Sequence, residues 1–245
     1  YLPFGYSHVV VANTLRKQNL DVFHAPAYSI PYQYRGTSVV TIHDLAIYPH
    51  PEWFPSKQKF STAVLVPSSV KRATKIIAVS QATAKMVSDY FNADTRDVPV
   101  VYEGFSKTQK IPKKIRTQIL NTVGVHGRFF FFVGTIEPRK NILGLINAFA
   151  AWQKSNPSET ELIIAGAPGW KNTEIFTAIK NTPKVHYIGY VSEKEKPVLY
   201  KLARIFVYPS FYEGFGLPVL DALRAGTPVI VSQRSALPEV TGSAA

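Results

Sequence analysis

Two carboxylates stand on either side of a glycine-rich turn in the segment FYEGFGLPVLDALRAGTPVIVS, residues 211–232. Glu213 precedes the turn, and Asp221 lies in the helix that we expect to follow it. Carboxylate oxygens accept hydrogen bonds from hydroxyl groups, and the N–H groups of a helix N-terminus favour an anion. The order of these groups therefore suits a phosphate between two sugars, one a ribose and the other a transferred hexose. The alternative is that Asp221 only complements the helix dipole and Glu213 only caps the helix.

The local sequence predicts the elements that would position these two acids. The apolar run 205–210 predicts a strand that leads into the turn. Gly214 and Gly216 permit a tight turn with close backbone approach. Pro218 suits the first position of a helix, and Gly226 suits the position just beyond its last residue. We therefore expect a strand, a glycine-rich loop and a short helix in succession.

A second segment, FFFFVGTIEPRKNILGLINAF at 129–149, has the same order of strand, glycine turn and helix. Gly134 ends the predicted strand, and Asn141 is the predicted N-cap of the helix. Arg139 and Lys140 stand immediately before that helix, where cations oppose the helix dipole unless an anion lies between. A diphosphate would supply this anion. We expect alanine at either position to weaken diphosphate binding and leave the fold intact; the alternative is two solvated basic side chains.

Composition limits the classes of protein that this chain can belong to. It has 245 residues, 46% of them hydrophobic and 18% charged, which suits one large or two modest globular domains. The net charge is +12, of which residues 1–105 contribute +3 and residues 106–245 contribute +9. This excess favours an anionic partner, although a solvated basic surface is the alternative. The absence of cysteine excludes disulfides, thiolate metal sites and cysteine nucleophiles.

Short apolar runs alternate with helical patterns along the chain, which predicts an α/β fold with parallel sheets and crossover helices. We expect helices over 81–91, 142–154 and 194–203. The basic stretch 106–118 predicts a linker and first helix between two α/β domains, 1–105 and 106–245; the alternative is a surface loop within one domain. Strands are expected at 21–25, 38–45, 75–80, 98–105, 128–134, 161–166, 185–191, 205–210 and 228–232.

One histidine stands where an α/β sheet places its ligands. His43 follows the apolar run VVTI, next to Asp44, at the predicted C-terminal end of a parallel strand. Ligands of open α/β sheets gather at that edge. An isolated histidine is more often structural, but this position favours a functional role. We expect structural roles for the other histidines, including His24 and His50.

The motifs of this chain, taken in order, resemble a known family. That family is the retaining nucleotide-sugar glycosyltransferases of the GT-B fold, especially the group of bacterial mannosyl- and glucosyltransferases. The resemblance covers nearly the whole chain. It implies two Rossmann-like, doubly wound parallel-sheet domains that face a cleft, with the donor held mainly by the C-terminal one. It rests on VVTIHDL, IIAVSQATAKMV, FVGTIEPRKNILGLINAF, LIIAGAPGW, YIGYVSEKE, EGFGLPVLD, RAGTPVIVS and SALPEVTGSAA.

The resemblance also implies roles for individual residues. Gly134, Arg139 and Lys140 would belong to the segment that binds the donor diphosphate. Glu213 would bind hydroxyls of the transferred sugar, and His43 would lie near that sugar. These last two are the catalytic candidates.

Further donor contacts follow from the same resemblance. The amides of Phe215, Gly216 and Leu217 would meet sugar and phosphate oxygens. Asp221 would hold the ribose diol, and the backbone near Val191 would border the base. Asp221 departs from the family, which usually has glutamate there. The stretch YEGF at 102–105 stands where the family often has Asn-Gly-Val, so Glu103 has no implied role.

The resemblance implies attack on the same face of the sugar through an oxocarbenium-like state, with the leaving diphosphate stabilised by cations and helix N-termini. We expect no metal, because the chain lacks an acidic D-x-D pair, and no cofactor beyond the donor substrate. Mannose is the favoured hexose, with glucose next. The acceptor would be a glycan or a lipid-linked molecule. The alternatives are a sugar-nucleotide epimerase of the same fold and a truncated, non-catalytic sugar-nucleotide-binding module.

Location and other partners are expectations of the same kind. No apolar run approaches the roughly 18 residues that span a bilayer, and we expect a cytoplasmic protein with peripheral contact at the inner face of an anionic membrane. The aromatic residues lie in core-like runs rather than among cations, which argues against nucleic acid as a partner. Against the family pattern the chain looks truncated at both ends, before Tyr1 and after Ala245.

Overall fold

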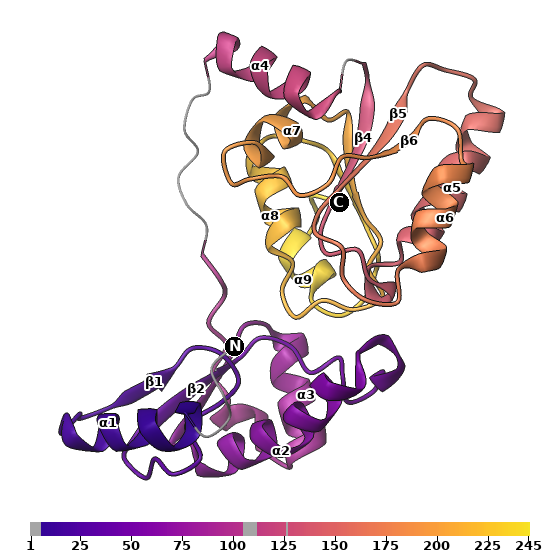
Figure 1. The fold of residues 1–245 in the computed structure, drawn as a ribbon. Helices are drawn as coiled ribbons and strands as arrows, with labels where there is room; N and C mark the ends of the chain where they lie inside the picture. The colour runs from indigo at the N-terminus through magenta and orange to yellow at the C-terminus, as the bar shows by residue number, and fades with distance from the viewer. Residues whose placement is uncertain (1–5, 105–111, 126) are drawn as a thin grey trace. The chain divides into compact units, whose positions relative to one another are not determined.

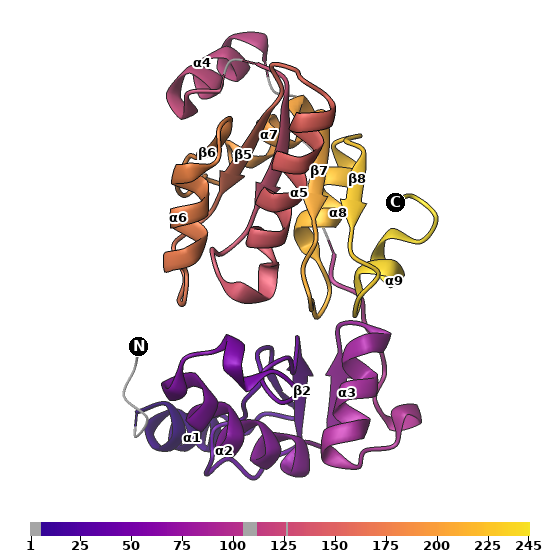
Figure 2. The same cartoon turned by 90° about the vertical axis from the view of Figure 1, so that its right-hand side faces the viewer.

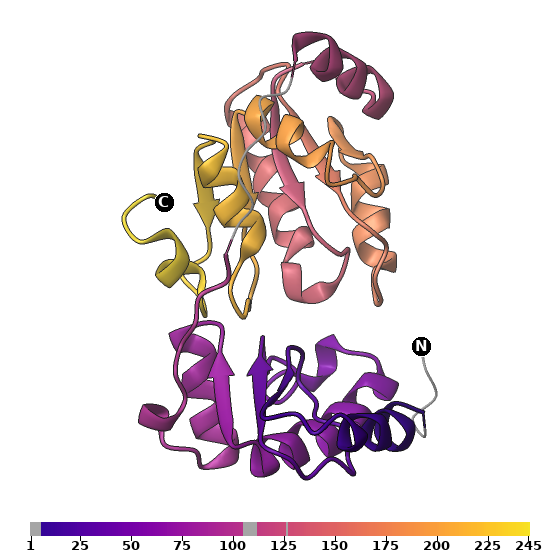
Figure 3. The same ribbon diagram turned by 90° about the vertical axis from the view of Figure 1, so that its left-hand side faces the viewer.

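The computed structural model describes residues 6–104, 112–125 and 127–245. Contacts divide the chain into two compact units, Tyr1–Glu103 and Gly104–Ala245, which we call the first and the second unit (Figures 1, 2 and 3). Each unit has one parallel β-sheet with helices packed against it, which confirms the predicted α/β class. No helix in the described part of the chain is both long and apolar enough to cross a bilayer.

The first unit has a three-stranded sheet in the order β1-β2-β3. All its strands are parallel, and Val40 of the central strand pairs with Ala25 on one side and Ile76 on the other. Val40 and Ile42 have no exposed surface, because the central strand is covered on both faces. The strands are β1 Phe23–Ala25, β2 Ser38–Ile42 and β3 Lys75–Ala78, and the α-helices are α1 Val11–Lys17, α2 Ser56–Arg72 and α3 Gln81–Phe91.

The loop after β1 is held against α2. The guanidinium of Arg72 donates to the carbonyl oxygens of Ile30, Pro31 and Tyr34 at 3.0–3.2 Å. The hydroxyl of Ser69 accepts the N–H of Ile30 at 3.0 Å. These bonds join segments about 40 residues apart, so the loop and the helix form one packed layer.

The prediction of a strand at 98–105 is wrong. Val100 forms only an isolated parallel bridge with Ala78. Pro99 has no N–H to continue the ladder, so the pairing is confined to one residue. The N–H of Ala78 donates to the Pro99 carbonyl at 3.1 Å, and the N–H of Val101 donates to the Ala78 carbonyl at 2.9 Å. Residue 105 lies outside the described residues.

The second unit has a five-stranded parallel sheet in the order β6-β5-β4-β7-β8. Its central strand is apolar throughout, and Phe131 and Phe132 have no exposed surface. Figure 1 shows α5 and α6 on one face of this sheet and α7 and α8 on the other. The strands are β4 Phe129–Val133, β5 Glu161–Ala165, β6 Val185–Tyr187, β7 Ile205–Tyr208 and β8 Val229–Val231. The helices are α4 Lys113–Val123, α5 Ile142–Ser155, α6 Thr173–Asn181, α7 Lys196–Leu202, α8 Leu217–Arg224 and α9 Leu237–Thr241.

Several predicted bounds change in the second unit. The strand predicted at 185–191 ends at Tyr187, and Gly189 then has a positive φ of 77°, which turns the chain out of the sheet. The helix expected at 194–203 forms as α7. Of the predicted linker and helix at 106–118, residues up to 111 lie outside the described residues, and the remainder lies in or next to α4.

The strand order of the second sheet has a topological switch point between β4 and β7. From β4 the chain adds β5 and then β6 on one side, and it later returns to add β7 and β8 on the other. The direction of winding therefore reverses between β4 and β7. In open α/β sheets the crevice beyond the carboxyl ends of the strands at such a switch point is the usual ligand site.

A close backbone approach shapes the exits from β4 and β5. A Cβ atom on Gly166 would lie 1.8 Å from the carbonyl oxygen of Gly134, and Gly166 has a φ of +137°. Only glycine satisfies both conditions. The loops that leave the two strands can therefore run side by side toward the switch point.

Candidate functional site

The loops that follow β4 and β7 carry the predicted site residues, and they are hydrogen-bonded to each other. Gly134 directly follows β4, as predicted, and its loop leads into a short 3-10 turn, Pro138–Lys140. The loop after β7 returns to this turn, because the N–H of Phe211 donates to the carbonyl of Arg139 at 2.9 Å. The switch point thus places residues about 70 positions apart in the sequence against each other.

Four charged side chains form a buried charge cluster here, consisting of Glu137, Arg139, Lys140 and Glu213. Lys140 Nζ donates to Glu213 Oε1 at 2.6 Å. Arg139 Nη1 donates to Glu213 Oε2 at 3.1 Å, and Nη2 donates to Glu137 Oε1 at 2.7 Å. Glu137, Lys140 and Glu213 are each at most 6% exposed. The sequence predicts Arg139, Lys140 and Glu213 at one site, and in the structure both cations bind Glu213.

The electrostatics of the cluster keep Glu213 ionised. Burial alone would raise the pKa of Glu213, but the charges of Lys140 and Arg139 outweigh it and hold that pKa below its ordinary value. Burial, together with the negative charge of Glu213, raises the pKa of the neighbouring Tyr208 well above its ordinary value. Tyr208 therefore stays neutral, and its hydroxyl accepts a hydrogen bond from Lys140 Nζ at 2.8 Å.

This pairing argues against the expectation that Arg139 and Lys140 could each be removed with the fold intact, an expectation that stays a prediction. Two carboxylates and two cations make the cluster formally neutral, and removing either cation would leave a buried carboxylate short of its partner. Lys140 nevertheless keeps some capacity for a ligand. Its ammonium has three N–H groups, of which two are used, and the third donates to no residue in the described part of the chain.

The start of α8 supplies further donors. Gly216 is the N-cap of the helix with a φ of +115°, and Pro218 is its second residue, one position later than predicted. The N–H groups of Gly216 and Leu217 donate to no described residue, so they are available to an anion. Leu217 is 41% exposed, whereas Phe215 is 7% exposed and packs inward. Gly226 follows the helix at positive φ, as predicted.

Asp221 differs from Glu213 in its surroundings. It lies in α8 and is half-buried, and its carboxylate accepts no hydrogen bond from the described residues. Burial raises the pKa of Asp221, and the nearby charges of Arg224 and Lys196 only partly oppose this. Asp221 is therefore an under-used acceptor at the surface, whereas both oxygens of Glu213 are occupied.

The remaining donor candidates lie along the same sheet edge. Gly134 donates its N–H to the carbonyl of Ala165 at 3.0 Å, so that N–H forms a hydrogen bond between the exits of β4 and β5. Val191 follows β6, two strands from β4, and only 1% of its surface is exposed. Its neighbour Tyr190 is 69% exposed.

Asn141 does not cap α5 as predicted. It occupies the N-cap position with a φ of +53°, but its side chain accepts no cap hydrogen bond. Its Nδ2 instead donates to the carbonyl of Pro209 at 3.2 Å. Asn141 therefore joins the β4 loop to the β7 loop, while its amide group lies against Gly144 in the first turn of α5.

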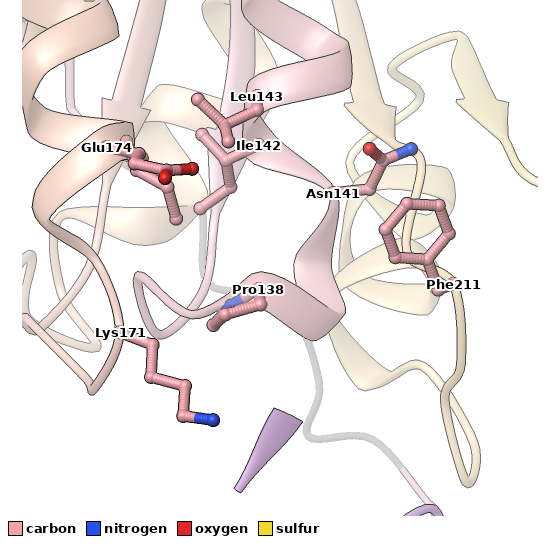
Figure 4. A pocket seen from close by; sticks show the side chains of 8 residues that line it. Pro138, Asn141, Ile142, Leu143, Lys171, Glu174 and Phe211 are labelled. Carbon is pink, nitrogen blue, oxygen red and sulfur yellow. The ribbon is translucent and has the colours of Figure 1, made fainter. Parts of the chain in front are cut away.

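A pocket of about 230 Å³ lies beside the start of α5 (Figure 4). Its lining is mostly apolar, from residues such as Ile142, Ile175 and Phe211, and Lys171 and Glu174 supply its charges. The charge cluster is not part of its lining. The candidate donor site therefore consists of the charge cluster and the α8 N-terminus and does not include this pocket.

His43 lies in the first unit, directly after β2, as predicted. Its Nδ1 is 2.7 Å from Glu103 Oε1, and its Nε2 is 2.7 Å from the carbonyl oxygen of Pro26. His24 Nε2 lies 2.8 Å from Thr41 Oγ1, and His50 Nδ1 lies 3.2 Å from Glu52 Oε1. Among the described residues, no group of three or more metal-ligating side chains is placed to hold a metal ion.

Sequence reasoning missed three residues that the structure places against the predicted ones. Glu137 binds Arg139, Tyr208 binds Lys140, and Glu103 binds His43. One local signal pointed to Glu137, which stands two residues before Arg139. Nothing local connects Tyr208 to Lys140 or Glu103 to His43, because these pairs are 68 and 60 residues apart.

Comparison with known proteins agrees with this architecture. The chain is 31% identical over 240 residues to O-antigen chain mannosyltransferase B of Escherichia coli, which covers 94% of this chain and 61% of that protein. It is 30% identical over 203 residues to O-antigen chain mannosyltransferase RfbU of Salmonella typhimurium, which covers 82% of this chain and 53% of the relative. The chain thus spans little more than half the length of these curated relatives.

Solved structures support the fold. The glycosyltransferase WaaG superposes with a TM-score of 0.74 at 16% identity, over 95% of this chain and 65% of that one. Anabaena HepE in complex with UDP-glucose superposes with a TM-score of 0.72 at 20% identity, over 97% of this chain and 66% of that one. At these identities the likeness establishes the GT-B fold alone. Residues 122–245 match the family described as glycosyl transferases group 1, and the chain therefore belongs to that family.

Proposed function

We propose that this chain supplies the donor site of a retaining hexosyltransferase. The enzyme would move a hexose from a nucleoside-diphosphate sugar to a glycan or lipid-linked acceptor. The observation that carries the proposal is the buried charge cluster at the β4–β7 switch point, next to the N–H groups of Gly216 and Leu217 at the start of α8. The names of the two mannosyltransferase relatives favour mannose over glucose.

Binding of the diphosphate would begin at α8 and not at the cluster, because the cluster is formally neutral. The N–H groups of Gly216 and Leu217, together with the helix dipole, attract a phosphate oxygen. The third N–H of Lys140 can donate to the same group. As Lys140 turns toward the phosphate, its bond to Glu213 weakens, and a carboxylate oxygen becomes available to a sugar hydroxyl. Donor binding and release of Glu213 would therefore occur together.

The same groups would assist the chemical step. Negative charge develops on the leaving diphosphate as the bond to the sugar breaks. Lys140 and the α8 amides would be in place to stabilise that charge, and preorganised donors of this kind each lower the barrier by roughly 3–4 kcal/mol. Glu213 would hold the sugar, and Asp221 would accept the ribose hydroxyls with a carboxylate that no described residue occupies. Arg139 would act through Glu213, whose carboxylate it holds.

The experiment is a calorimetric screen of the full 245-residue chain against GDP, UDP, GDP-mannose and UDP-glucose. The Lys140→Met variant should lose affinity for every diphosphate, while Lys154→Met, on the exposed end of α5, should not. Equal affinity of the two variants would contradict the site.

Mass spectrometry and anomeric NMR of products with an acceptor then test transfer and retention. An interconverted sugar still on its nucleotide would indicate an epimerase, and binding without turnover would indicate a binding module.

Peripheral contact with an anionic membrane is a separate part of the proposal. Its support is the +9 charge of residues 106–245 and the exposed Lys114 on α4, next to Ile115, which is 44% exposed. The chain should sediment with vesicles that contain anionic lipid and not with neutral vesicles, and salt should release it. Equal behaviour toward both kinds of vesicle would contradict this contact and the proposed location at the inner membrane face.

A further inference from the structure

Both ring nitrogens of His43 face oxygen acceptors. Nδ1 lies 2.7 Å from a carboxylate oxygen of Glu103, and Nε2 lies 2.7 Å from the carbonyl oxygen of Pro26. An ionised carboxylate and a carbonyl oxygen have no hydrogen to donate, so each contact requires an N–H from the ring. A neutral imidazole has only one N–H, whereas an imidazolium has two. A doubly protonated ring satisfies both contacts at once.

We propose that Glu103 is a positioning residue for His43: its carboxylate fixes the imidazole ring at the end of β2 and keeps both ring nitrogens protonated. Glu103 belongs to the stretch YEGF at 102–105 and is the last residue of the first unit. Its side chain is 21% exposed and that of His43 is 36% exposed, so the carboxylate is the more sheltered partner.

The surroundings of the ring favour the same charge state. The hydrogen bond to Glu103 raises the pKa of His43, and the Pro26 carbonyl and the charge of Asp44 add to this, while burial opposes it. From the loop after β1, the ring of Tyr28 lies against His43, with 5.6 Å between the ring centroids. From α3, the hydroxyl of Thr83 donates to the His43 carbonyl at 3.1 Å.

The two hydrogen bonds differ in their access to a ligand. The contact between Nε2 and the Pro26 carbonyl is exposed, whereas the one between Nδ1 and Glu103 is partly buried. A ligand oxygen can therefore replace Pro26 at Nε2 while Glu103 retains Nδ1. Resting on the proposed function, we infer that this oxygen is a hydroxyl of a sugar substrate, which would then receive a hydrogen bond from a cation.

An NMR titration of the full chain tests the positioning role without any donor. The His43 ring signals, assigned by their loss in His43→Gln, are followed between about pH 5 and 9. Glu103→Gln keeps the shape of the side chain and an oxygen acceptor but removes the charge. We expect the His43 pKa to fall in Glu103→Gln and to stay at its original value in Glu52→Gln, the matched change at the His50–Glu52 pair. An unchanged His43 pKa in Glu103→Gln would overturn the proposal.

A second measurement, made with the donor substrate, distinguishes failure of this inference from failure of the proposed function. With the nucleotide sugar that the screen selects, Glu103→Gln should lower affinity about tenfold between the His43 pKa of the variant and that of the unaltered chain, and much less outside this range, since only there is the ring charged in the unaltered chain and neutral in the variant. Affinity for the bare nucleotide should not change. If the His43 pKa falls but sugar affinity is the same at every pH, the positioning role stands and the placement of His43 at the sugar fails.

Discussion

Lys140 Nζ lies 2.6 Å from Glu213 Oε1, and both residues are buried. A charge pair this deeply buried is costly to separate, because the partner that remains must stay in a medium that solvates it poorly. The pair is therefore a structural element of the second unit before any ligand arrives.

Removal of one member of this pair should destabilise the second unit. We expect Lys140→Met to lower the free energy of unfolding by about 3–5 kcal/mol, the usual result of leaving a buried charge without its partner. The double variant with Glu213→Gln should regain part of that loss, because no unpaired charge remains. Urea unfolding followed by circular dichroism measures all three. Lys154→Met is the control, and a Lys140→Met variant as stable as this control would show that the pair contributes nothing.

Substitution of Asp221 and substitution of Glu213 should have different effects on ligand affinity. Asp221→Asn should weaken binding of free nucleotide and nucleotide sugar by the same factor, corresponding to about 1–3 kcal/mol, because it would contact only the ribose. Glu213→Gln should weaken the nucleotide sugar more than the free nucleotide, since its own partner would be the hexose. Calorimetry with GDP, UDP and their sugar conjugates gives both ratios.

The stability of these variants supplies an internal check. Burial raises the pKa of Asp221, so its ionised form is disfavoured in the folded protein, and Asp221→Asn should not lower stability at neutral pH. Glu159→Gln, at a side chain that is 98% exposed and pairs with Lys184 at the surface, is the control for loss of an exposed charge. Loss of stability without any change in ligand affinity, in both acid variants, would leave the acids with structural roles only.

Gly216 should be sensitive to the smallest side chain. Its φ is +115°, and a Cβ atom would lie 2.9 Å from Cδ2 of Leu237. We expect Gly216→Ala to lower the free energy of unfolding by about 1–2 kcal/mol from backbone strain, and to weaken diphosphate binding as the α8 amides shift. Gly127→Ala, where the nearest atom would be 3.9 Å away, should change neither. Diphosphate affinity equal to that of the unaltered chain would exclude the α8 amides as the phosphate site.

Binding of the diphosphate should not require a metal ion. The groups that we assign to the phosphate are a lysine and backbone N–H groups, which already supply positive charge. Calorimetric affinities for GDP and UDP should therefore be the same with and without EDTA. A loss of binding in EDTA that magnesium or manganese restores would show that this assignment is incomplete.

The His43–Glu103 pair should give stability a defined pH dependence. The folded-state pKa of His43 is raised above its ordinary value of 6.5, so its contribution to stability is fully present below that value and is lost as pH rises through the folded pKa. The difference in unfolding free energy between the unaltered chain and Glu103→Gln should therefore be largest at mildly acidic pH and shrink as the solution becomes alkaline. A difference that is constant with pH would contradict a charged pair.

The sequence predicted elements better than it predicted contacts. Gly134, Gly216 and Gly226 marked the ends of strands and helices because their backbone conformations are local properties. The strand at 98–105 failed for a local reason as well, since Pro99 removes a donor from the ladder.

The pairing of Lys140 with Glu213 could not be predicted from the local sequence. It depends on β4 and β7 being neighbours, which the winding of the sheet decides and not the residues of either loop. The basic pair was expected to be unfavourable unless an anion lay nearby, and the structure supplies that anion from within the chain.

The contact between Gly166 and the Gly134 carbonyl has a consequence for comparing related chains. Any side chain at 166 would have to push apart the exits of β4 and β5, because a Cβ atom there would lie 1.8 Å from that oxygen. Glycine at this position is thus a marker for the loop path that leads to Arg139 and Lys140. A relative with another residue at 166 must have rebuilt that path, and the roles proposed for the two basic residues should not be transferred to it by alignment alone.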